Sequence, residues 1–285
     1  MSIKKEIVQQ IELTKLLPFP DHPFAVRDDE IMQETVESIS KYGVLVPAIA
    51  RPLPDGNYEL ISGHRRKNAC DRAGYKTMPV IVRDLDDDAA TIMMVDSNLQ
   101  REKILPSEKA KAYKMKLEAI KRQGTRVDLT SAQVGRKLET AEIIGQDAGD
   151  SRTQVRRYIR LTELKPELQQ MVDEGKMGMT PAVELSYLSE EEQAILLTAI
   201  ESEQTSPSLS QAKRIRKLSE EKTLTDDSVL QIMSEKKKPE EQNLSFSVEK
   251  IRKYFPKSYT PRQMEETILD LLAKWLRKRQ RETER

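Results

Sequence analysis

Tyr58-Glu-Leu-Ile-Ser-Gly63-His-Arg-Arg66-Lys-Asn-Ala69 is the stretch from which the organisation of the chain is best understood. Its first five residues have the composition of a strand, and a helical pattern begins directly after Gly63. A helix that opens after a glycine presents backbone N–H groups and the positive end of its dipole, and two arginines in its first turn add forked donors suited to phosphate oxygens. The stretch predicts either a site for a phosphate-bearing ligand or a glycine-capped helix with a solvated basic turn.

The segments around this stretch alternate between predicted strands and predicted helices. Apolar runs at 44–51 and 78–83 predict strands, and Pro54-Asp-Gly-Asn57 predicts the turn that pairs the first run with 58–62 in a hairpin. Leu13 to Pro18 predicts a further short strand, which a proline-stiffened loop follows.

The first covering helix opens at Asp28-Asp29-Glu30 and stops at Gly43, with Ile31, Val36 and Ile39 as its predicted buried stripe. Strands that alternate with helices in this way predict a small α+β domain, which we place at residues 1–125.

Two more helices complete the predicted domain. Asp84 to Asp88 is acidic enough to be a site, but carboxylates ahead of a helix are usually N-caps, and a capped helix ending near Asp96–Arg101 is predicted there. Leu105-Pro-Ser-Glu108 starts the next helix, and Gly124 is predicted to end it.

Composition limits the chemistry that the chain can carry. A formal net charge of +1 points to no class of partner, whereas four arginines without an acid between Ser151 and Arg160 are a local basic cluster. The single cysteine, Cys70, excludes an internal disulfide and a cysteine-based zinc site, and two histidines offer little for a metal. No apolar run has membrane-spanning length and no signal-peptide pattern is present, so we predict a cytoplasmic protein with no membrane partner.

The middle of the chain predicts a helix-turn-helix within an all-α domain at 126–220. A short helix at 129–138 and glycines at Gly145 and Gly149 precede a helix that Ser151 caps, with Val155 facing inward. Its outer face and cap are the predicted contacts to double-stranded DNA: Ser151, Arg152, Thr153, Gln154, Arg156, Arg157 and Arg160. The alternative is an ordinary helical hairpin with a solvated basic face.

The last part of the chain predicts a charged linker at 221–243 and a helical segment at 244–285. An amphipathic helix at 261–277 has little of its own chain to pack against, which predicts a homodimer. Packing of this helix onto the middle domain is the alternative.

Three segments together resemble the ParB family of DNA-partition proteins: Gly43-Val-Leu-Val-Pro-Ala-Ile-Ala-Arg51, Gly63-His-Arg-Arg66-Lys-Asn-Ala69 and Asn98-Leu-Gln-Arg101-Glu. The resemblance implies that the first segment flanks the base of CTP and that Gly63, His64, Arg65 and Arg66 hold its triphosphate. It also implies that Asn98 helps to hold Mg²⁺ and that Arg101 supports the phosphates.

The same resemblance implies a function and partners. The chain is predicted to be a site-specific, nucleoid-associated partition protein that closes on DNA as a CTP-responsive sliding clamp, with a ParA-type ATPase as a further partner. A helix-turn-helix transcriptional regulator with a degenerate nucleotide pocket is the alternative.

Two positions depart from the family pattern, in which Glu follows the glycine and Glu precedes the asparagine. This chain has His64 and Ser97 there. A missing carboxylate removes a hard ligand near Mg²⁺ and a group that could assist an attacking water. The catalytic residues are therefore unknown, and weak CTP hydrolysis stays an open question. A sulfiredoxin-like enzyme would need a cysteine at the position of His64, and a nuclease would need clustered acids other than helix caps.

Overall fold

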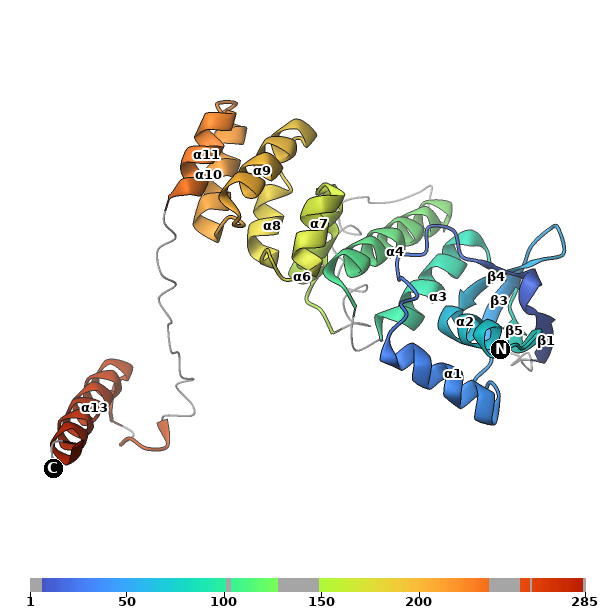
Figure 1. Ribbon diagram of the computed structural model, residues 1–285, viewed down its shortest axis with the longest axis horizontal. Coiled ribbons are helices and arrows are strands. Elements are labelled where there is room, and N and C mark those ends of the chain that lie inside the picture. The colour runs from blue at the N-terminus through green and yellow to red at the C-terminus, as the bar shows by residue number, and fades with distance from the viewer. Residues whose placement is uncertain (1–6, 101–103, 128–148, 236–251, 257, 284–285) are drawn as a thin grey trace. The chain divides into compact units, whose positions relative to one another are not determined.

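A computed structural model describes residues 7–100, 104–127, 149–235, 252–256 and 258–283 (Figure 1). The chain divides into two compact units, Met1–Glu235 and Lys236–Arg285. The first unit holds a mixed sheet with its covering helices and then a run of short helices.

The sheet has five strands in the order β1-β5-β3-β4-β2. Their bounds are β1 Val8–Glu12, β2 Leu16–Pro18, β3 Ala48–Pro52, β4 Tyr58–Ser62 and β5 Thr77–Val82. β3 and β4 form the predicted antiparallel hairpin, β1 runs antiparallel to β5, and the pairs β3–β5 and β2–β4 are parallel. Of the strand predicted at 13–18, only Leu16–Pro18 is a strand, β2, because Leu13–Lys15 forms a 3-10 turn. β1 lies before this segment and was not predicted.

Helices α1 (Glu30–Tyr42) and α2 (His64–Arg72) pack against each other. Asp29 caps α1 by accepting a hydrogen bond from the Met32 amide, and Gly43 ends it with φ +72°, as predicted. Together with the sheet these helices enclose an aliphatic core that includes Met32, Ile39, Ala48, Ala50, Leu60, Ala69, Cys70, Met78 and Val80.

Helices α3 (Asp87–Leu99) and α4 (Pro106–Val127) pack side by side. The Asp86 carboxylate caps α3, which confirms the predicted role of the acidic run. A second core joins Phe24 and Ile61 to Met94 of α3, Tyr113 of α4 and Val155 of a later helix. This core is continuous from the sheet to the helical region.

The helical region contains α6 (Arg152–Arg160), α7 (Pro166–Asp173), α8 (Met179–Leu185), α9 (Glu190–Glu203), α10 (Leu209–Glu220) and α11 (Asp226–Ser234), with a 3-10 turn at Leu161–Glu163. Ser189, Ser208 and Thr225 form capping boxes at the starts of α9, α10 and α11. These local signals fix where each helix begins.

Two predictions about the first domain are wrong in part. Ile31 was predicted to be buried but is 53% exposed, and the neighbouring Met32 is buried in its place. The strand predicted at 44–51 is shorter, since β3 begins only at Ala48 and both Leu45 and Val46 are exposed. Both predictions rested on apolar composition alone. Composition does not distinguish apolar residues that pack in a core from apolar residues that line a surface groove.

Two predicted ends also differ from the structure. α4 continues through Gly124 to Val127, since one glycine inside a helix costs only about 1 kcal/mol. The predicted linker at 221–243 contains α11, whose buried Val229, Ile232 and Met233 pack into the core of the helical region. Its acidic first turn and serine-rich composition concealed this apolar stripe.

The second unit contains α13 (Pro261–Thr283). Met264 is 4% exposed, whereas Leu272, Trp275 and Leu276 are all more than half exposed. In the parts of the chain that the structure describes, no helix is long and apolar enough to cross a membrane.

Candidate functional site

The predicted phosphate turn, Gly63–Arg66, joins β4 to α2 as the sequence indicates. Gly63 has φ +109°, and a Cβ atom there would lie 2.8 Å from the Cβ of Ala48. Any other residue would suffer both an unfavourable backbone conformation and a clash with the neighbouring strand. Glycine is therefore required for the close approach of the turn to β3.

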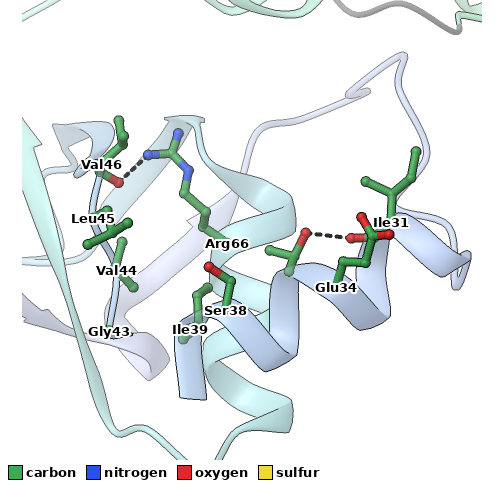
Figure 2. A pocket seen from close by; sticks show the side chains of 10 residues that line it. Ile31, Glu34, Ser38, Ile39, Gly43, Val44, Leu45, Val46 and Arg66 are labelled. Carbon is green, nitrogen blue, oxygen red and sulfur yellow. Dashed lines mark hydrogen bonds between the residues drawn. The ribbon is translucent and has the colours of Figure 1, made fainter. Parts of the chain in front are cut away.

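A groove of about 370 Å³ lies beside this turn, and we call it the α1 groove (Figure 2). Its lining residues come from α1, from the segment that follows it and from α2: Ile31, Glu34, Thr35, Ser38, Ile39, Gly43, Val44, Leu45, Val46 and Arg66. Ile31, Leu45 and Val46 are exposed, so their apolar side chains are accessible to a ligand. Of the predicted nucleotide-binding residues, the groove brings together Gly43 and Arg66.

Arg66 is the only cation among the residues that line the α1 groove. Its guanidinium donates hydrogen bonds to the backbone carbonyls of Val46 and Pro47, the second at 2.7 Å. Burial lowers the pKa of Arg66 below its usual value, but a guanidinium remains charged at neutral pH. A positive charge therefore lies at the edge of an apolar groove.

Arg65, the neighbouring residue, is bound to a carboxylate. Its Nη2 lies 2.7 Å from Oδ1 of Asp29, the residue that caps α1. The hydrogen bond from Arg65 lowers the pKa of Asp29. A phosphate that bound Arg65 would have to displace this carboxylate.

His64 is the residue of the turn at which α2 begins. Its side chain is buried, and its ring centroid is 4.0 Å from that of His22. His22 in turn is hydrogen-bonded through Nδ1 to the Phe24 carbonyl at 2.8 Å. The histidine that replaces the glutamate of the family pattern therefore packs against the proline-rich loop.

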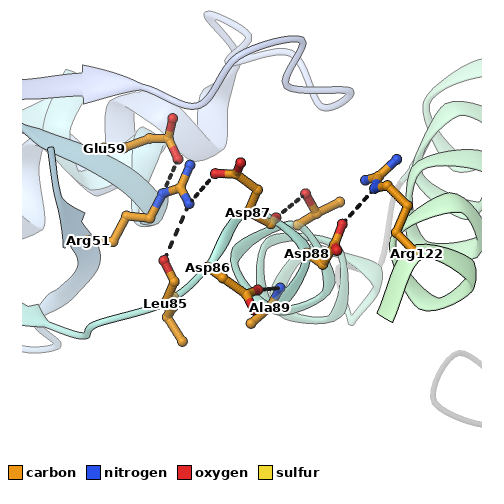
Figure 3. Close-up of polar contacts among 9 residues, drawn as sticks. Arg51, Glu59, Leu85, Asp86, Asp87, Asp88, Ala89 and Arg122 are labelled. Carbon is orange, nitrogen blue, oxygen red and sulfur yellow. Dashed lines mark hydrogen bonds and ion pairs between the residues drawn. The ribbon is translucent and has the colours of Figure 1, made fainter. Parts of the chain in front are cut away.

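Arg51 belongs to a different cluster, which Figure 3 shows. It bonds to Glu59 at 2.7 Å and to Asp87 at 2.6 Å, and it also donates to the Leu85 carbonyl. Burial by itself lowers the pKa of Arg51, but the hydrogen bonds that Arg51 donates to Glu59 and Asp87 outweigh burial and raise it. Arg51 thus ties β3 to β4 and to the start of α3, and it does not line the α1 groove.

Asn98 is buried near the end of α3, and its amide nitrogen donates to the Met94 carbonyl at 2.7 Å. Only its carbonyl oxygen has the chemistry of a Mg²⁺ ligand, which fits a metal held mainly by nucleotide phosphates. Ser97 is exposed and also donates to Met94. Among the described residues, no group of three or more histidines, cysteines or acids could hold a metal ion by itself.

α6 carries the four arginines of the predicted basic cluster, but Arg152, Arg157 and Arg160 are half-buried. Ser151 caps it by accepting a hydrogen bond from the Gln154 amide, and Val155 is fully buried. Thr153, Gln154 and Arg156 are exposed. The first turn, Arg152–Gln154, is called the reading end below.

The last two predicted DNA-contacting arginines of α6 have partners within the protein. Arg157 donates to the Thr180 hydroxyl at 2.5 Å. Arg160 donates to both Ser186 oxygens and stacks on Tyr187 at 4.0 Å, and Arg216 stacks on the same ring at 3.9 Å. Arg160 therefore fastens α6 to α8, a role that its sequence position did not indicate.

Other predicted residues lie outside the described ranges: Arg101, the helix at 129–138 and Gly145. Sequence reasoning missed the contribution of α1 to the groove, for which the only signal was the apolar segment before Pro47. It also missed contacts of α4 with the start of α6, which have no local signal at all.

Two family models match the chain, the ParB N-terminal domain over residues 1–99 and the ParB HTH domain over residues 102–216. The chain belongs to the ParB family. Among ParB-related proteins, Stage 0 sporulation protein J of Bacillus subtilis (strain 168) is 33% identical over 179 residues, or 63% of this chain and 57% of that protein. The chain spans about half the length of the curated relatives it matches.

Two solved structures of the C-terminally truncated chromosome-partitioning protein ParB from Caulobacter crescentus are also similar. The complex with the centromeric parS site is 27% identical, covers 73% of this chain and 98% of that chain, and gives a TM-score of 0.46. The complex with CTP-gamma-S is 30% identical, covers 66% and 96% respectively, and gives a TM-score of 0.31. The family assignment comes from the two sequence matches over residues 1–99 and 102–216.

Proposed function

We propose that this ParB-family chain is a site-specific DNA-binding partition protein that binds CTP in its N-terminal domain. The observation that carries the proposal is that one continuous core connects the domain with the α1 groove to the exposed reading end of α6. Relatives named for chromosome partitioning bind the two corresponding ligands, parS DNA and CTP-gamma-S.

The proposed nucleotide site combines an apolar groove with a cationic edge. A volume of 370 Å³ falls in the range of small-molecule sites, about 300–1,000 Å³. The base would contact the segment after Gly43, and the phosphates would bind Arg65, Arg66 and the N-terminus of α2. Mg²⁺, held by the phosphates and Asn98, would supply charge neutralisation. Arg51, His64 and Arg101 stay predictions, and no residue is assigned to hydrolysis.

The proposed DNA site is the exposed face of α6. In this proposal Gln154 and Arg152 contact base edges from the reading end, and Arg156 contacts phosphates. Ser151 caps the reading end, and Thr153 is exposed within it. Arg157 and Arg160 support α6 through their contacts with Thr180 and Ser186. Binding to DNA would place the protein on the nucleoid.

The proposed partner of α13 is a second copy of the chain. Leu272, Trp275 and Leu276 are each more than half exposed, so this helix has an apolar stripe that a second copy could contact. Dimers joined at 244–285, with an N-terminal domain at 1–125 and a helical region that continues through α11, would close around DNA as a clamp. A ParA-type ATPase stays a prediction from the resemblance.

The proposal is tested by CTP titration calorimetry on the full chain, with and without a duplex that the chain selects from a randomised library. Wild-type binding should be measurable and should tighten when that duplex is present, because both ligands are proposed to favour the same closed state. Arg66→Ala should weaken CTP binding at least about tenfold, since a charge-assisted hydrogen bond contributes about 1.5–3 kcal/mol. DNA affinity should not change.

Arg72→Ala is the matched control, since Arg72 lies on the same helix and pairs with Asp28 outside the groove. It should leave CTP binding unchanged. Equal loss in both variants would show a general effect of charge or folding in place of a specific contact.

The second candidate function is a transcriptional regulator without a nucleotide switch. One observation favours it: Arg65 and Arg66 both have partners within the protein, and His64 is buried. Sequence-selective DNA binding together with no CTP binding in either condition would establish this function and overturn the proposed switch.

A further inference from the structure

The reading end of α6 is fastened to α4 through one residue, Asp150, which immediately precedes the cap Ser151. The Tyr113 hydroxyl of α4 donates to Asp150 Oδ2 at 2.5 Å. The Lys109 ammonium, one helical turn earlier on α4, lies 2.5 Å from the same oxygen. Two donors from one helix therefore converge on a single carboxylate at the start of another.

This cluster is shielded from solvent. The Asp150 side chain is 11% exposed, that of Lys109 is 19% exposed, and Tyr113 is fully buried. The Lys109 ammonium also lies 4.9 Å from the ring centre of Tyr158, on the inner side of α6. Burial raises the pKa of the Tyr113 hydroxyl, and the bond to Asp150 raises it further, so the hydroxyl stays a donor at all physiological pH.

The backbone on either side of Asp150 links its side-chain contacts to the direction of α6. Gly149 has φ +69°, so the chain turns sharply just before Asp150, and Arg152 follows directly after the cap. The direction in which the reading end points is therefore set within two residues of the carboxylate. A carboxylate without a cation here would also repel DNA phosphates, and Lys109 neutralises it.

We propose that Asp150 is a positioning residue for DNA recognition, held by Tyr113 and Lys109 so that the reading end of α6 meets base edges in one orientation. The inference rests on the proposed DNA-binding function and adds to it a group that contacts no DNA. It also assigns α4, which packs on α3, as the element that fixes the reading end relative to the N-terminal domain.

The test compares two affinities of the full chain, one for the duplex that wild type enriches from a randomised library and one for a scrambled duplex of equal length. A variant that only unfolds part of the protein lowers both affinities equally, so the ratio reports orientation and not stability. Asp150→Ala should lower the ratio about tenfold, comparable to the loss of one good base contact. Asp150→Asn keeps an acceptor for both donors and should stay within about twofold of wild type.

Tyr113→Phe removes only the hydroxyl and keeps the buried ring, so it tests the positioning role of Asp150 even if Asp150→Ala does not fold. The ratio should fall at least about twofold, because one of two hydrogen bonds to the carboxylate is lost. Thermal melting of each variant accompanies the binding measurements.

Asp173→Ala is the matched control. Asp173 also joins α4 to a neighbouring helix, since its oxygens accept from the Ser107 amide at 2.9 Å and from the Ser107 hydroxyl at 2.5 Å, but it lies at the end of α7. It should lower the melting temperature and leave the ratio unchanged.

The outcomes separate the two proposals. A wild-type chain that enriches no sequence overturns the proposed DNA recognition and this inference with it. A wild-type chain that discriminates, with Asp150→Ala or Tyr113→Phe discriminating equally well, overturns the positioning role alone. A ratio that Asp173→Ala lowers as much as Asp150→Ala also overturns it.

Discussion

The two basic helix starts of this protein differ in how their charges are held. At α2, Arg65 is bound to Asp29, Arg66 donates to backbone carbonyls, and His64 is buried. At α6, Ser151 supplies a local cap, and Gln154 and Arg156 are exposed. One start is closed by contacts within the protein, and the other is open to a large partner.

This difference indicates how each site would meet its polyanion. Duplex DNA presents a dense line of phosphates to a surface that is already formed, so little rearrangement is required. A nucleotide at α2 would have to exchange places with Asp29 and with carbonyl groups, and its net affinity would be reduced by those lost contacts. The α2 site is thus suited to a response that depends on conformation, and the α6 site to simple docking.

The largest expected effect is on the free energy of unfolding, which should depend more on the glycine before α2 than on the cap of α6. Gly63→Ala combines a left-handed conformation with a clash against Ala48 and should cost about 2–5 kcal/mol of unfolding free energy. Ser151→Ala removes only a cap and should cost about 1 kcal/mol. Urea unfolding of both variants measures the contrast.

Gly74→Ala is the control for the backbone conformation. Gly74 has φ +77° but no atom within 4 Å of an added Cβ, so only strain of about 1–2 kcal/mol is expected. If Gly63→Ala were no more destabilising than Gly74→Ala, the close approach to β3 would not matter.

The next effect is on DNA binding by the exposed residues of α6. Gln154→Ala should cost about 1–3 kcal/mol on the selected duplex and relax the preference at one base pair. Arg156→Ala should weaken binding to all sequences alike and lower the slope of affinity against salt by about one. Fluorescence anisotropy at several salt concentrations distinguishes the two; an identical response in both variants would refute the division into base and phosphate contacts.

The smallest effect is on CTP affinity at the start of α2, where Asp29 holds Arg65. Asp29→Asn keeps a side-chain acceptor for the cap of α1 but releases Arg65 from its carboxylate, so CTP should bind a few-fold more tightly. Asp28→Asn makes the same change of charge and releases Arg72, which lies outside the groove. Calorimetry should show no gain for that control, and a gain of equal size would reflect net charge alone.

Much of the fold could be predicted because its signals are local. Asp29, Asp86 and Ser151 cap the helices that follow them, and Gly43 ends α1 where expected. Each of these contacts joins residues three or four positions apart, so the sequence written in order contains both partners. The hairpin of β3 and β4 follows from its turn residues for the same reason.

The sequence by itself determined where α1, α3 and α6 begin, that a glycine joins β4 to α2, and that α6 carries basic residues. Only the tertiary structure decided which cations of the two sites are held by carboxylates, carbonyls or rings. Arg65 and Asp29 are 36 residues apart, Arg160 and Ser186 are 26 apart, and Tyr113 and Asp150 are 37 apart. Such pairs form because the packing of whole helices and strands brings them together, and no periodicity or cap in either segment encodes its distant partner.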